Sequence, residues 1–107
     1  MVAAVDGEVD LLTVDVFDTE IARVMNDPCN GFVVDLTTTT FFSAAGMRVL
    51  RRVQRDRRAG QLFAVAAPDH IARPMRLIGL DAEISIHPTV DLALSCLANT
   101  GADRAAS

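Results

Sequence analysis

Hydroxyl-bearing residues in the middle of the chain are the ones whose type and spacing could support chemistry. Four threonines, Thr37 to Thr40, follow Asp35, and Ser43 stands just before a stretch with helical spacing. We expect the threonines to form a polar loop between a buried strand and this helix. A helix start favours an anion or an acceptor side chain, because its N–H groups are unpaired. The hydroxyl of Ser43 is expected to cap the helix by accepting one of these N–H groups.

Common catalytic motifs are missing from the sequence. It contains no Gly-x-Ser-x-Gly elbow, phosphate-binding loop, dinucleotide-binding glycine motif or His-Glu-x-x-His pair. His70 and His87 have no Cys or His neighbour at ligand spacing, and Cys29 and Cys96 are too few for a disulfide framework. We therefore expect no enzyme activity, no metal and no cofactor, and we expect two ordinary thiols in a reducing compartment.

Asp35 could instead be a phosphate acceptor, as in the receiver domains of response regulators. Receivers also need an acidic pair after the first strand and a lysine late in the chain. Asp6 and Glu8 are a poor copy of that pair, and the chain contains no lysine. The favoured interpretation is an acid at a strand end that accepts hydrogen bonds from loop N–H groups.

Length and composition indicate a single domain, residues 1–107, with a modest core. The chain has no apolar run of 18 residues and no basic region at its start, which favours the cytoplasm. A net charge of −4 argues against non-specific nucleic-acid binding. The charge is uneven, because residues 1–35 hold eight acids and six of the ten arginines lie in Arg48–Arg58.

Short apolar runs alternate with segments of helical spacing along the chain. The expected strands are Val2–Val5, Phe32–Val34, Leu62–Ala66 and Glu83–His87, and the expected helices are Leu11–Asp27, Ala45–Arg58, Ile71–Ile78 and Val90–Ala98. Thr13 and Asp69 are the expected caps of the first and third helices, and the tail 99–107 is expected to be disordered. The alternation predicts an α/β fold with a mainly parallel four-stranded sheet and about four helices.

The second expected helix, Ala45–Arg58, is strongly amphipathic. Its apolar side faces away from a row of five arginines, namely Arg48, Arg51, Arg52, Arg55 and Arg58. The arginines are interpreted either as a solvated face or as a basic surface that meets a partner. Met47 lies off the apolar side, so it is either an exposed apolar contact or a partly covered residue at the edge of the core.

The stretch Gly31–Leu50 resembles the signature of STAS domains, the family of bacterial anti-sigma factor antagonists. That signature has an apolar strand, Asp-Leu, a polar step, an apolar pair, then Asp-Ser-Ser-Gly-Leu and a helix. The matching residues are Val33-Val34-Asp35-Leu36, Phe41-Phe42 and Gly46-Met47. The chain departs from the signature at three positions, where Ser43 replaces Asp, Ala44 replaces the phosphorylatable Ser and Ala45 replaces the second Ser.

The resemblance covers nearly the whole chain, from Val2 to Leu97. Gly7-Glu8-Val9-Asp10 resembles the Gly-x-x-Asp step that follows the second strand of the family. The family has a further strand before this step, and we expect that strand to be missing here. One sheet edge would then be open to self-association.

The resemblance implies that the chain binds a kinase-like anti-sigma factor, which frees the sigma factor, and that it binds neither nucleic acid nor a membrane. In the family, the partner phosphorylates the serine at the helix start, and the added charge of about −1.5 to −2 breaks the complex. Ala44 cannot be phosphorylated, so we expect the usual switch to be absent, with Ser43 as a candidate for a relocated one. The partner-binding residues implied by the resemblance are Asp10, Ser43, Ala44, Gly46 and Met47.

Two other functions stay open at this point. Some STAS domains sense nucleotides or other ligands, so the chain could be a ligand-sensing or phosphoacceptor domain. It could also be a degenerate copy that serves only as a non-switching oligomerisation module.

Overall fold

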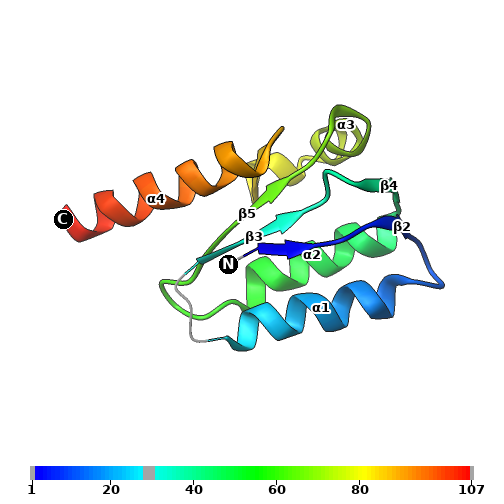
Figure 1. The fold of residues 1–107 in the computed structure, drawn as a ribbon, viewed down its shortest axis with the longest axis horizontal. Helices are drawn as coiled ribbons and strands as arrows, with labels where there is room; N and C mark the ends of the chain where they lie inside the picture. Colours follow the sequence, from blue (N-terminus) through cyan, green and yellow to red (C-terminus); the bar gives the residue numbers. More distant parts are fainter. Residues whose placement is uncertain (1, 28–30, 107) are drawn as a thin grey trace.

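Four parallel strands form the central sheet, in the order β1-β3-β5-β6 (Figure 1). They are β1 (Val2–Ala4), β3 (Gly31–Asp35), β5 (Leu62–Ala66) and β6 (Ser85–His87). Parallel neighbours need crossover connections, and the helices between the strands supply them. The predicted α/β class and parallel four-stranded sheet are therefore confirmed. The computed structural model describes residues 2–27 and 31–106, with side chains as far as Asn99, so Cys29 lies outside the described residues.

The described residues contain four α-helices, as predicted. They are α1 (Val14–Asn26), α2 (Ala44–Asp56), α3 (Asp69–Leu77) and α4 (Val90–Ala106), and a short 3-10 helix, η1 (Leu80–Ala82), precedes β6. The expected cap of α3 is wrong, because Pro68 occupies the N-cap and Asp69 is the first helical residue. Helix α4 continues beyond Ala98 into the segment that was expected to be disordered. Within the described segments, no helix combines the length and the hydrophobicity that a membrane span requires.

The helices cover both faces of the sheet. Helices α1 and α2 lie side by side on one face and α4 crosses the other (Figure 1). Successive residues of a strand point to opposite faces, so β3 contributes to both layers. Phe32 and Val34 belong to the large core that includes α1 and α2, and Val33 packs with alanines of β5 and α4 on the opposite face. Burial on both faces explains why the two central strands, β3 and β5, are continuous apolar runs.

A second, two-stranded sheet lies beside the first and was not predicted. It pairs β2 (Gly7–Val9) in parallel with β4 (Thr39–Phe42). The expectation of a polar loop is therefore wrong for the last part of the threonine run. Thr39 is buried and its hydroxyl donates to the carbonyl oxygen of Val5 at 2.7 Å, which allows a polar residue to enter a strand. Gly7 has a φ of 77°, which suits glycine, at the point where the register of β2 shifts.

Candidate functional site

Two turns that are far apart in the sequence meet at one end of the molecule. The first is the β2–α1 loop, residues 10–13, and the second is the β4–α2 junction, residues 43–47. They are joined because β2 pairs with β4 and the backbone N–H of Ser43 donates to the carbonyl oxygen of Val9 at 2.8 Å. The small sheet thus brings all five residues expected to bind a partner to one place. We call residues 10–13 and 43–47 together the loop end.

Asp10 organises the first turn of the loop end. Its Oδ1 accepts hydrogen bonds from the backbone N–H groups of Leu12 at 2.9 Å and Thr13 at 3.1 Å. Thr13 occupies the N-cap of α1, as expected, but its hydroxyl makes no capping bond. That hydroxyl accepts from the N–H of Asp10 at 3.0 Å and lies 2.8 Å from the carbonyl oxygen of Glu8, to which it donates. The carboxylate of Asp10, and not the hydroxyl of Thr13, therefore accepts the hydrogen bonds from the backbone N–H groups at the start of α1.

The same turn presents two leucines to solvent. Leu11 is 77% exposed and Leu12 is 91% exposed. Phe41, on the neighbouring strand β4, is a third large apolar residue at the surface, 53% exposed. Sequence reasoning missed the leucines because they fell inside an expected amphipathic helix. The Asp-x-x-Thr spacing from Asp10 to Thr13 is typical of a turn that is held by side-chain hydrogen bonds. This spacing could have indicated that the leucines lie in a turn before the helix.

Ser43 begins α2 at its N-cap, but its side chain makes no capping hydrogen bond. Its Oγ is buried and has no hydrogen-bond partner among the described residues. The expectation that this hydroxyl caps the helix is therefore wrong. A buried hydroxyl without a partner costs roughly 1–3 kcal/mol, so the position is unfavourable for stability. The backbone of Ser43 is nevertheless well bonded, since its carbonyl oxygen accepts the N–H of Met47 at 3.1 Å.

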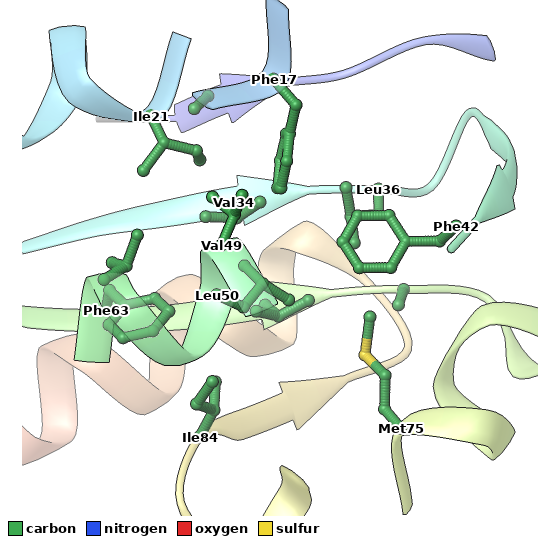
Figure 2. Close-up of a cluster of buried hydrophobic side chains, with 14 of the residues drawn as sticks. Phe17, Ile21, Val34, Leu36, Phe42, Val49, Leu50, Phe63, Met75 and Ile84 are labelled. Atoms are coloured by element: carbon green, nitrogen blue, oxygen red, sulfur yellow. The ribbon is translucent and has the colours of Figure 1, made fainter. Parts of the chain in front are cut away.

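The other three expected residues lie in the first turn of α2 with different exposures. Ala44 is exposed, Gly46 is buried, and Met47 is half-buried and packs against the core. A Cβ on Gly46 would lie 2.7 Å from Cζ of Phe42, so the glycine leaves room for that ring. The rings of Phe42 and Phe17 meet edge to face at 5.4 Å (Figure 2). Met47 is therefore a partly covered residue at the edge of the core, as the second of its two interpretations expected.

The threonine loop is bound to the ends of two strands. The carboxylate of Asp35 accepts the N–H of Thr37 at 2.9 Å and its hydroxyl at 2.6 Å. The hydroxyl of Thr38 donates to the carboxylate of Asp6. The favoured interpretation of Asp35, a strand-end acid that accepts loop hydrogen bonds, is confirmed. In the part of the chain that the structure describes, no three His, Cys, Asp or Glu side chains are grouped to hold a metal ion.

A groove of about 540 Å³ runs between α1 and α2 from the loop end. Its lining residues are Leu11, Val14, Asp15, Asp18, Ala45, Arg48, Val49, Arg51, Arg52 and Arg55. Arg52 pairs with Asp18, Arg51 with Glu83 at 3.2 Å, and Arg55 with Asp56 at 3.3 Å. Arg48 pairs with no acid among the described residues. Three of the five arginines in the row are therefore engaged by acidic side chains, and Arg58 donates to the backbone carbonyl oxygen of Asp27 at 3.1 Å.

The model of the STAS domain family matches residues 1–93. The chain belongs to the STAS domain family. The anti-sigma-F factor antagonist RsfB of Mycobacterium tuberculosis, matched in two strains, is 28% identical over 104 residues, which cover 96% of this chain and 85% of the relative. A crystal structure of an anti-sigma factor antagonist from Mycobacterium paratuberculosis superposes with a TM-score of 0.84 at 30% identity, covering 89% of this chain and 82% of that one. These findings confirm the family that the central stretch indicated.

Proposed function

We propose that this STAS domain is an anti-sigma factor antagonist, which binds a kinase-like anti-sigma factor in the cytoplasm and thereby affects transcription that depends on a sigma factor. Two kinds of support converge on this proposal. Relatives that match most of the chain are named anti-sigma factor antagonists. The observation that carries it is the near-complete exposure of Leu11 and Leu12 beside the start of α2. Leu77 and Ile78 are also adjacent and exposed, but Leu11 and Leu12 lie beside the residues that the family resemblance implies for partner binding, which is why this pair supports the proposal.

Some residues of the loop end would contact the partner directly, and others would hold the contacting residues in place. Leu11, Leu12 and Ala44 are exposed and would contact the partner, with Met47 at the rim. Asp10 would act indirectly, because its carboxylate holds the turn that presents the leucines. Gly46 would also act indirectly, because it is buried and gives Phe42 the space to support α2.

Regulation at this site would differ from the family pattern. Ala44 has no hydroxyl at the position of the family's phosphorylated serine. The Oγ of Ser43 is buried, so a kinase could not reach it without opening the start of α2. The hydroxyls of Thr37, Thr38 and Thr39 are engaged in hydrogen bonds within the fold. Thr40 is exposed, but it lies on β4 and not at the start of α2, where the family has its phosphorylated serine. These observations support an antagonist that stays competent to bind in the presence of ATP.

The direct test mixes the purified chain with the purified anti-sigma factor of the same organism, with and without ATP and magnesium. Calorimetry would measure the affinity, and mass spectrometry would measure phosphate on the chain. We expect binding of equal affinity in both conditions and no gain in mass. Absence of binding in both conditions would contradict the proposed function. Loss of binding with ATP, together with an added phosphate, would contradict only the unswitched behaviour.

Self-association through a sheet edge is a second candidate, favoured by one observation. Strand β1 pairs with β3 on one side, and no other described strand pairs with it. An unpaired strand edge can accept a strand of another chain. Sedimentation over a range of concentrations would test this, with a dimer as the expected species. A monomer at every concentration would contradict self-association and leave the antagonist proposal intact.

A further inference from the structure

The groove between α1 and α2 differs in charge from the rest of the molecule. Its lining holds four arginines and two aspartates, whereas the whole chain has a net charge of −4. The apolar part of the lining consists of Leu11, Val14, Ala45 and Val49. Leu11 and Ala45 also belong to the loop end, so the groove continues the exposed leucine surface. Figure 1 shows α1 and α2, the two helices that supply the lining of the groove, running side by side along one face of the sheet.

We propose that this groove binds an acidic segment of the anti-sigma factor, an inference that rests on the proposed function. Arg48 is the expected ion-pair partner of this segment, because it pairs with no described acid and lines the same groove as Leu11. Arginine binds carboxylates through two parallel hydrogen bonds, which suits aspartate or glutamate side chains of the segment. The apolar residues of the segment would pack on Leu11 and Val14.

The spacing of the arginines favours an extended segment over a single small anion. Arg48 and Arg55 are about 10 Å apart along α2, at 1.5 Å per residue, so the four arginines of the groove are spread along the length of a bound segment. Arg51, Arg52 and Arg55 already have acidic neighbours, so they form no concentrated site for a point charge. Their pairs are on the surface, where such pairs contribute little, so they can exchange partners when the segment binds.

The test is a charge reversal with a matched control. Arg48→Glu reverses a side chain that pairs with no described acid, so the fold should be retained. Arg73→Glu makes the same charge change on α3, where Arg73 is also exposed and pairs with no described acid. We expect R48E to weaken binding of the anti-sigma factor roughly tenfold at low salt and R73E to leave it unchanged. The affinity of R48E should also depend less on salt than that of the wild type.

The possible results distinguish a failure of the groove inference from a failure of the proposed function. No binding by the wild type would contradict the proposed function, and the groove inference would fall with it. Wild-type binding that R48E leaves unchanged, or that R48E and R73E weaken equally, would contradict the groove inference alone. If R48E unfolds, Arg48→Ala replaces it, and a loss of roughly threefold is then expected, while an unchanged affinity again overturns the inference.

Discussion

The two turns of the loop end are held in place by different physical means. In the β2–α1 loop, a carboxylate and a hydroxyl make hydrogen bonds with the backbone, and the apolar side chains point to solvent. In the β4–α2 junction, the side-chain hydroxyl of Ser43 makes no hydrogen bond, and the ring of Phe42 packs beneath Gly46. The first turn is anchored by polar groups and the second by packing. This difference leaves Leu11 and Leu12 available for a partner, and it makes the start of α2 part of the core.

The largest effect should come from filling the space at Gly46. Gly46→Val would place side-chain atoms against the ring of Phe42, and the free energy of unfolding should fall by about 2–3 kcal/mol. Urea denaturation would measure this change. The matched control is the double variant Gly46→Val with Phe42→Leu, in which the smaller side chain relieves the clash. Equal or greater stability of the single variant than of the wild type would show that packing does not hold this turn.

A smaller effect is expected in the polar turn. Asp10→Ala removes the acceptor of two backbone N–H groups, so stability should fall by about 1–2 kcal/mol and the leucine loop should lose its shape. Asp10→Asn keeps an acceptor oxygen and should lose much less. Thermal unfolding and the affinity for the anti-sigma factor would be measured for both. Equal losses in the two variants would mean that the negative charge, and not the hydrogen bonds, matters at this position.

The smallest effect should come from Ser43. Ser43→Ala removes a buried hydroxyl that has no described partner, so stability should stay the same or rise by up to about 1 kcal/mol, because the loss of packing at the removed oxygen offsets part of the gain. Partner affinity should also stay the same. Denaturation of the wild type and the variant side by side would decide the point. A loss above about 1 kcal/mol would show that the hydroxyl makes a stabilising hydrogen bond and would remove the contrast with Asp10.

The large elements could be predicted from the sequence because burial determines them. Continuous apolar runs such as Leu62–Ala66 fit only a strand covered on both faces, and the amphipathic spacing of Ala45–Arg58 predicted α2. The sheet of β2 and β4 could not be predicted in the same way. Its strands have only three and four residues, too few to show a clear hydrophobic pattern, and they exist because residues distant in the sequence pair with each other.

The sequence indicated residues that the fold brings together, but it did not indicate how exposed each of them is. The resemblance placed Asp10, Ala44 and Gly46 at the site, and all three lie at the loop end. It could not reveal that the Oγ of Ser43 is buried, because that depends on how β4 enters α2. Nor could helical spacing show that Leu11 and Leu12 precede α1 and face solvent, because the loop exists only through the bonds of Asp10.

The most direct test of the central claim is the affinity of Leu12→Asp for the anti-sigma factor. Leu12 is 91% exposed, so the substitution should leave the fold unchanged, as circular dichroism would verify. The control is Leu92→Asp on α4, where a leucine that is 51% exposed lies on the opposite face of the sheet. If the loop end binds the partner, L12D should weaken binding by about thirtyfold or more while L92D binds like the wild type. Wild-type affinity of L12D, or equal losses in both variants, would contradict the account.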